Sequence, residues 1–179
     1  MNTRTPSIFT SAVLALAVTV GAPALAATKL SHKDSSFLKD AAEANNAEVE
    51  ASRIAVAQST NGDVKSFAQS MIDDHTSAQG ELKALADQKG VKVSDTASLT
   101  KQAEIKILSK RKDASFDRHY AEAIGVKAHE DTIKLFRKEA EKGDDPDVKA
   151  WAAKTLPALT HHLDLAQNLK TKTDAEPKN

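Results

Sequence analysis

Apolar residues recur along most of the chain at alternating steps of three and four, which is the period of a helix that buries one face. Three polar breaks interrupt this pattern: "STNGD" at 59–63, "QKGVKVSD" at 88–95 and "EKGDDPD" at 141–147. Each break combines turn residues with a Ser or Asp that can cap a following helix. The pattern therefore predicts helices at about 35–58, 63–89, 97–110, 114–142 and 146–171.

The spacing of these helices predicts their topology. Short turns join the first two long helices and the last two, which favours two antiparallel hairpins. Residues 90–113 are too many for a tight turn and suit a crossover that contains one short helix. We therefore expect an all-α, ferritin-like four-helix bundle over residues 35–171. Pro157 predicts a bend in the last helix, and the polar end, residues 172–179, is expected to be disordered.

On each long helix, the residues at alternating steps of three and four form a stripe that is predicted to be buried. Each of these stripes contains one side chain that can bind a metal ion. These residues are Glu48, His75, His129 and His162. Neighbouring residues on a helix point about 100° apart, so only one of His161 and His162 can face the core, and the stripe selects His162. The stripe of the fourth helix is expected to comprise Glu122, Val126, His129, Ile133, Phe136 and Ala140.

The depth of these residues within each hairpin also follows from the sequence. Glu48 and His75 are equally distant from the "TNGD" turn, and His129 and His162 are equally distant from the "GDDPD" turn. Residues equally distant from the turn of an antiparallel hairpin lie at the same level, here to within about one helical turn, or about 5 Å. The register between the two hairpins depends on how the crossover docks them.

Imidazole and carboxylate ligands together suit one divalent transition-metal ion, such as Zn, Cu, Fe or Ni. Four carboxylates next to the stripe positions are candidates for supporting the ligands: Glu50, Asp74, Asp117 and Glu130. The alternative is a buried hydrogen-bond network without metal, in which Glu48 stabilises the histidines.

The first 26 residues have the features of a secretory signal peptide. "MNTR" supplies a positive charge, "SIFTSAVLALAVTVGAP" is an apolar run, and "ALA" at 24–26 fits a signal-peptidase site, with cleavage after Ala26. The alternative is a membrane anchor, but the run is shorter than the roughly 20 residues that a spanning helix needs. We expect a periplasmic mature chain without an integral span, and association with the outer membrane remains open.

Composition narrows the function classes. The chain has no cysteine, which excludes thiolate metal ligands, CxxC redox chemistry and a cysteine nucleophile. Loss of Arg4 with the signal peptide leaves a net charge of about −1, which gives no electrostatic reason to bind nucleic acid. "HEDTI" at 129–133 lacks the second histidine of the HExxH motif, so an enzyme is the least favoured class. The composition indicates no particular protein partner or oligomer.

Five blocks of the chain resemble the exported bacterial family called domain of unknown function 4142: "AEVEASRIA", "VKSFAQSMIDDH", "FDRHYAEA", "AHEDTIKLF" and "LPALTHHLDLA". The resemblance covers about residues 36–170 and implies a ferritin-like fold in an exported protein, without an established activity. The positions that match the family pattern are Glu48, Glu50, His75, Asp117, His129 and His162.

The sequence departs from the di-iron pattern of ferritins. Those proteins carry a Glu three residues before a His on two helices. Here Ile72 stands three residues before His75, and Leu159 stands three residues before His162. A site for a single ion is therefore expected.

Two functions follow from these observations. The first is a periplasmic metal-binding bundle that serves in buffering or stress. The second is a structural or stress-related interaction module whose buried His/Glu network fixes the helix register or senses pH, because histidine titrates near neutrality.

Overall fold

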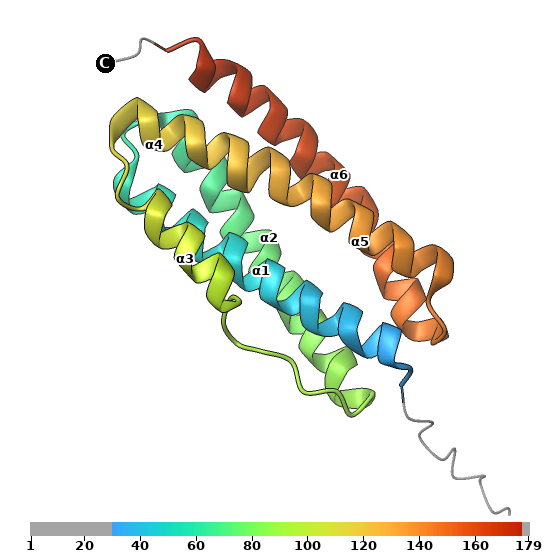
Figure 1. Cartoon of the computed structure of the whole chain (residues 1–179). Coiled ribbons are helices and arrows are strands. Elements are labelled where there is room, and N and C mark those ends of the chain that lie inside the picture. Colours follow the sequence, from blue (N-terminus) through green and yellow to red (C-terminus); the bar gives the residue numbers. More distant parts are fainter. Residues whose placement is uncertain (1–29, 177–179) are drawn as a thin grey trace, which may run out of the picture.

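The structure is a computed structural model that describes residues 30–176, so the predicted signal peptide lies outside the described residues. Its long helices run side by side as two antiparallel hairpins, α1 with α2 and α5 with α6 (Figure 1). This all-α bundle confirms the predicted fold class. The elements are α1 (His32–Gln58), α2 (Gly62–Gln88), α3 (Leu99–Leu108), α4 (Asp113–His119), η1 (Tyr120–Lys127), α5 (Ala128–Lys142) and α6 (Pro146–Asp174).

The helices begin where the sequence supplies a capping side chain. Asn61 accepts hydrogen bonds from the backbone N–H groups of Asp63 and Val64 at the start of α2. Asp145 caps α6 in the same way, with Pro146 at the first helical position, where its missing N–H costs no hydrogen bond. The "STNGD" and "EKGDDPD" breaks thus contain both hairpin turns as predicted, although the cap of α2 is Asn61 rather than the expected Asp63.

The crossover passes through an extended stretch after α2 and then forms α3, which packs along α1 (Figure 1). Gly90 adopts a φ of 67° just after α2, a conformation that glycine enters without steric cost. α3 is the short helix predicted at 97–110, and it is two residues shorter at each end than predicted.

The predicted helix at 114–142 is not one regular α-helix. It consists of α4, the π-helical segment η1 and α5. A π-helix closes its hydrogen bonds over five residues, so its buried face advances differently from that of an α-helix. Tyr120 and Gly125 are buried, whereas Glu122 is exposed. The inward placement of Glu122 was wrong because the α-helical period was continued through a π-helical turn.

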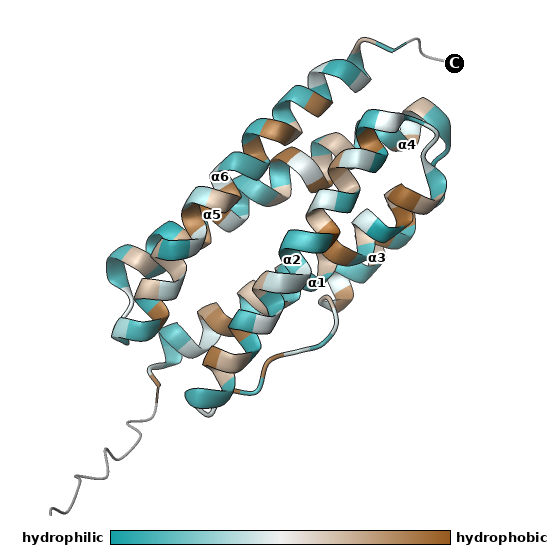
Figure 2. Cartoon of the chain, turned by 180° about the vertical axis from the view of Figure 1, so that it is seen from behind, coloured by the Kyte–Doolittle hydropathy of each residue, from teal (hydrophilic) through white to brown (hydrophobic). Residues whose placement is uncertain are grey.

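The apolar core has two parts with a polar layer between them. One part surrounds Phe67, Phe116 and Tyr120, and the other contains Phe37 and Trp151. Along each long helix, the residues between these two parts include one buried histidine or glutamate. Figure 2 shows hydrophobic residues interspersed with hydrophilic ones along the helices, as amphipathic helices require.

The last helix differs from its predicted end. α6 continues to Asp174, three residues beyond the predicted boundary, and Thr173 is buried. Residues 172–174 of the expected disordered tail are thus helical, and 177–179 lie outside the described residues. Pro157 lies inside α6 as expected. None of the helices within residues 30–176 is long and apolar enough to cross a membrane.

Candidate metal centre

Four polar side chains meet in the layer between the two parts of the core. Glu48 comes from α1, His75 from α2, His129 from α5 and His162 from α6, and each is at most 5% exposed. The three imidazole rings form a nearly equilateral triangle, with centroids 5.3–5.6 Å apart. One ligand nitrogen from each ring lies within 4.8 Å of the others. The docking of the two hairpins thus brings both predicted pairs to one level.

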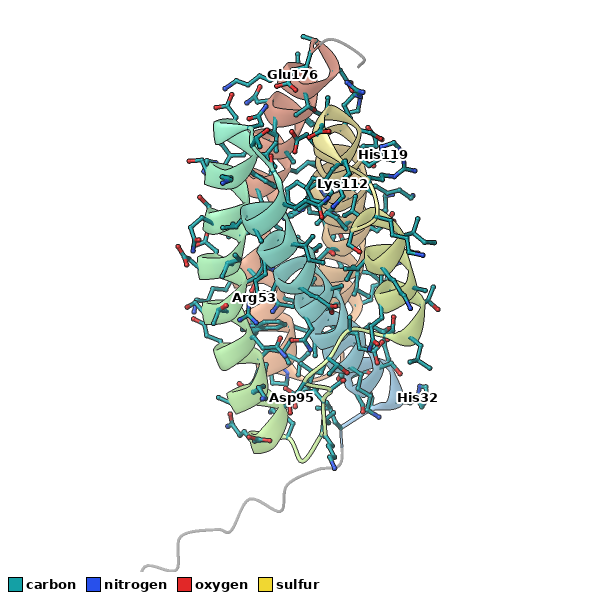
Figure 3. The ribbon with its side chains drawn as sticks, turned by 90° about the vertical axis from the view of Figure 1, so that its left-hand side faces the viewer. His32, Arg53, Asp95, Lys112, His119 and Glu176 are labelled. Carbon is teal, nitrogen blue, oxygen red and sulfur yellow. The ribbon has the colours of Figure 1, made fainter. Side chains whose placement is uncertain are left out.

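The carboxylate of Glu48 faces two of these rings. Its Oε2 atom lies 3.0 Å from Nε2 of His75 and 3.4 Å from Nε2 of His129. His162 completes the cluster, whereas its neighbour His161 is exposed. His32 and His119 are exposed on the outside of the bundle (Figure 3). Among the described residues, His75, His129 and His162 form the only group of three or more potential ligands whose ligand atoms are close enough together to hold a metal ion.

The outward nitrogens of two rings are held by neighbouring groups. Nδ1 of His75 lies 2.8 Å from Oδ1 of Asn45, whose amide nitrogen donates to the backbone carbonyl of His75. Nδ1 of His129 lies 3.3 Å from the carbonyl oxygen of Ile124 in η1. These contacts fix both rings with Nε2 pointing toward Glu48.

The third ring is held by Asp74, one of the four carboxylates that the sequence offered as support. Oδ2 of Asp74 lies 2.9 Å from Nε2 of His162. Glu50 and Glu130 are exposed and do not enter the cluster. Asp117 is buried near Ser59, at the turn between α1 and α2, and does not enter the cluster.

One atom of each of the four residues lacks a hydrogen-bond partner in the described part of the chain. These atoms are Oε2 of Glu48, Nε2 of His75, Nε2 of His129 and Nδ1 of His162. The short distances to Glu48 therefore lack hydrogen-bond geometry. Unsatisfied buried polar atoms are costly and rare. In a metal-ligating histidine, one ring nitrogen is held by a neighbouring group and the other is free to bind the ion. The three histidines show this arrangement, so these residues fit a bound cation.

Burial and charge set the protonation of the cluster. Burial raises the pKa of Glu48, but the charges of His129 and His75 outweigh this effect, so the net pKa is lowered from 4.5 to about 2. Burial lowers the pKa of His75, and the adjacent Glu48 carboxylate more than compensates, so the net pKa is raised. Burial also lowers the pKa of His162, with Asp74 only partly opposing this effect. The carboxylate is thus ionised and His162 is neutral near pH 7, which are the forms that bind a metal. The raised pKa of His75 instead favours a proton on that ring, which a bound cation would have to displace.

A small cavity of about 70 Å³ adjoins the cluster. Its walls are mostly apolar and include Phe136 and Leu159. Asp74 and Ala158 also line it and are exposed, so the cavity reaches solvent between α2 and α6.

Sequence reasoning missed two partners of the rings. Asn45 lies three residues before Glu48 on the same face of α1, so the polar run "EANNAEVE" could have indicated it. The Ile124 carbonyl is a backbone group placed by η1, and no side-chain pattern signals it.

The fold is similar to two solved bacterial structures. A DUF305 fragment from Deinococcus radiodurans matches with a TM-score of 0.71 and 11% identity, over 81% of this chain and 99% of that one. A conserved hypothetical protein from Mycobacterium tuberculosis matches with a TM-score of 0.60 and 19% identity, over 82% of this chain and 94% of that one. At these identities the likeness shows the fold alone.

No functionally curated protein matches the chain. The family described as "Domain of unknown function (DUF4142)" matches residues 20–169, which include all four residues of the cluster. The sequence blocks, the helical bundle and this match agree, and the chain belongs to the DUF4142 family.

Proposed function

We propose that this protein is an exported helical bundle that binds one divalent transition-metal ion through Glu48, His75, His129 and His162. The observation that carries the proposal is that each residue contributes one buried atom without a hydrogen-bond partner among the described residues. A cation accepts the lone pairs of neutral imidazole and neutralises the carboxylate, so it removes the cost of all four atoms at once.

The ligand set favours binding over catalysis. Three imidazoles and one carboxylate suit Zn, Cu, Ni or Fe, and four protein ligands fill a tetrahedral coordination sphere. Catalytic sites of zinc enzymes usually keep one position for water or substrate. A role in metal buffering or in the response to metal stress in the periplasm is therefore the function we favour.

Export and location rest on the sequence. The apolar run and the "ALA" motif at 24–26 support a cleaved signal peptide and a periplasmic mature protein, which could associate with the outer membrane. A periplasmic bundle without cysteine would offer the harder imidazole and carboxylate ligands rather than thiolates to an incoming ion.

A second candidate is a structural module without metal. The raised pKa of His75 and the lowered pKa of Glu48 favour an imidazolium–carboxylate pair, in which a proton takes the place of the metal. Such a pair would fix the register of the helices at the level of the polar layer.

Metal stoichiometry separates the two candidates. Demetallated protein would be titrated with Zn, Cu and Ni separately, and bound metal measured after gel filtration. We expect one ion per chain for the wild type and for His161→Ala, and much less for His129→Ala. His161→Ala is the matched control because it removes an exposed histidine from the same region. Absence of bound metal in the wild type would favour the hydrogen-bond network.

A further inference from the structure

A second and larger cavity, of about 400 Å³, lies under the crossover helix α3. It is bounded by α1 on one side and by η1 and α5 on the other. Its walls are mainly apolar and include Ala47, Ile105, Leu108, Ile124 and Leu135. This volume falls within the range of about 300–1,000 Å³ that is typical of small-molecule sites.

The π-helical segment forms one wall of this cavity. Ala123, Ile124 and Lys127 of η1 all line it. π-helical turns within α-helices are rare and are often found at functional sites. The opposite wall is α3, which packs mainly on α1 and contributes Ile105 and Leu108.

The rim of the cavity is charged but balanced. Lys101 pairs with Glu104 at 2.9 Å, and Lys127 pairs with Asp131 at 3.6 Å. Each lysine is thus matched by a carboxylate, and all four residues line the cavity. The rim gives no net attraction to an ionic ligand, so the site favours a neutral molecule.

The inner end of the cavity is polar. Glu48 and Thr132 line both this cavity and the smaller one beside the histidines, so they form the partition between the two. Oε2 of Glu48 faces His75 and His129. Of the two carboxylate oxygens of Glu48, only Oε2 is fully enclosed without a hydrogen-bond partner among residues 30–176, so Oε1 is the oxygen that is open to this cavity. An ionised carboxylate oxygen is a strong acceptor for a hydrogen-bond donor.

We propose that this cavity binds a neutral, mostly apolar small molecule that carries one hydrogen-bond donor, such as an aromatic alcohol, with the donor directed at Oε1 of Glu48. The apolar walls bind the body of the molecule, and Glu48 with Thr132 binds its polar end. This site goes beyond metal binding, because the imidazole ligands do not line the larger cavity.

The test compares two probes of the same size on metal-free protein. 2-Naphthol carries a hydroxyl group where 2-methylnaphthalene carries a methyl group. A hydrogen bond to a charged acceptor should make 2-naphthol bind at least about tenfold more tightly, as measured by fluorescence titration. Equal affinities, or no saturable binding of 2-naphthol, would overturn the proposal.

Two variants locate the site. Ala44 lines the cavity, so Ala44→Phe should fill it and weaken 2-naphthol binding at least about tenfold. Ala57→Phe places the same ring on an exposed position of the same helix and should leave binding unchanged. Equal binding by wild type and a folded Ala44→Phe would show that the probe binds elsewhere and would contradict the proposal.

Methyl NMR of the wild type keeps the test independent of whether a variant folds. 2-Naphthol should shift the methyl signals of Ile105 and Ile124, which line the larger cavity. Shifts confined to Leu82 and Leu159, which line the smaller cavity, would overturn the assignment. Because no metal is present in these measurements, their failure leaves the metal titration unaffected, and a failed metal titration leaves this site untouched.

Discussion

A buried pair of carboxyl groups at one end of the bundle makes the stability of the fold depend on pH. Glu139 of α5 is 3% exposed and lies beside Asp34 of α1, which is fully buried. Both oxygens of Asp34 accept backbone N–H groups of the α5–α6 turn, from Asp144 at 3.0 Å and Asp145 at 2.8 Å. Asp34 therefore connects the start of α1 to the α5–α6 turn through these hydrogen bonds, and Glu139 lies next to Asp34.

Burial raises the pKa of Glu139, and the hydrogen bond to Asp34 and the charge of Asp34 raise it further, from 4.5 to about 7. A proton on Glu139 is thus bound more tightly in the folded protein than in the unfolded chain. Its stabilising contribution is fully present below pH 4.5 and is lost as the pH rises through about 7. Above pH 7 the folded protein must hold an ionised Glu139 in this buried position.

The size of this effect follows from the shift. Each pKa unit corresponds to about 1.4 kcal/mol, so the shift sets an upper limit of about 3 kcal/mol. The neighbouring side chains of Lys33 and Asp144 are 39% and 61% exposed, so solvent screens the pair. Screening reduces the expected effect to about 1–2 kcal/mol, or roughly 2–8 °C in the melting temperature of a domain of this size.

Glu139→Gln tests this reasoning. The amide keeps the shape of the protonated acid and can still donate a hydrogen bond to Asp34, but it cannot ionise. At pH 5 the variant should melt within about 1 °C of the wild type, and at pH 8.5 it should melt roughly 2–8 °C higher, as measured by circular dichroism.

Glu141→Gln is the matched control, because Glu141 is an exposed glutamate on the same helix. It removes the same charge and should change the difference between the two pH values by little. An equal change for Glu139→Gln at both pH values, or a loss of stability at pH 8.5, would refute the assignment of the raised pKa to the contact with Asp34.

Three further predictions concern the metal centre, the core and processing. A metal ion at about 100 times its Kd should raise the melting temperature of demetallated wild type by roughly 5–10 °C. That rise should be abolished in each of the variants His75→Ala, His129→Ala and His162→Ala, and a rise that survives in all three would place the ion elsewhere. Tyr120→Phe should cost about 1 kcal/mol in urea denaturation, because it removes the buried 2.8 Å hydrogen bond to Ser52; a double-mutant cycle with Ser52→Ala should show the coupling, and additive effects would contradict it. Mass spectrometry of the exported protein should find Ala27 at the N-terminus, and a chain that retains residues 1–26 would favour a membrane-anchored form.

Much of the fold could be predicted because its local signals agree with one another. Asp145 marks the start of α6 in the sequence and caps it in the structure, whereas the cap of α2 is Asn61 rather than the expected Asp63. The period of three and four residues separates the buried His162 from the exposed His161. These features depend on neighbours within one or two helical turns, and sequence patterns report such neighbours well.

What could not be predicted depends on contacts between distant segments. The π-helical turn of η1 leaves no periodic signal, and continuing the α-helical period through it placed the exposed Glu122 in the core. The register between the hairpins is set by core packing and by the crossover. Of the four carboxylates next to the stripes, only Asp74 contacts a ring of the cluster. Position beside a stripe fixes the direction of a side chain on its own helix, but not which group of a neighbouring helix it meets.

The position of the polar layer gives metal binding a consequence for the whole bundle. Each hairpin supplies two of the four residues, Glu48 with His75 and His129 with His162, so an ion at this point would connect both hairpins. Within a hairpin the helices pack extensively, whereas contacts between the hairpins are fewer. The free energy of metal binding would therefore add mainly to the weaker of these two associations. Loss of the ion should loosen α1 and α2 from α5 and α6 before it unfolds either hairpin, and amide hydrogen exchange along the facing sides of the hairpins would record that order.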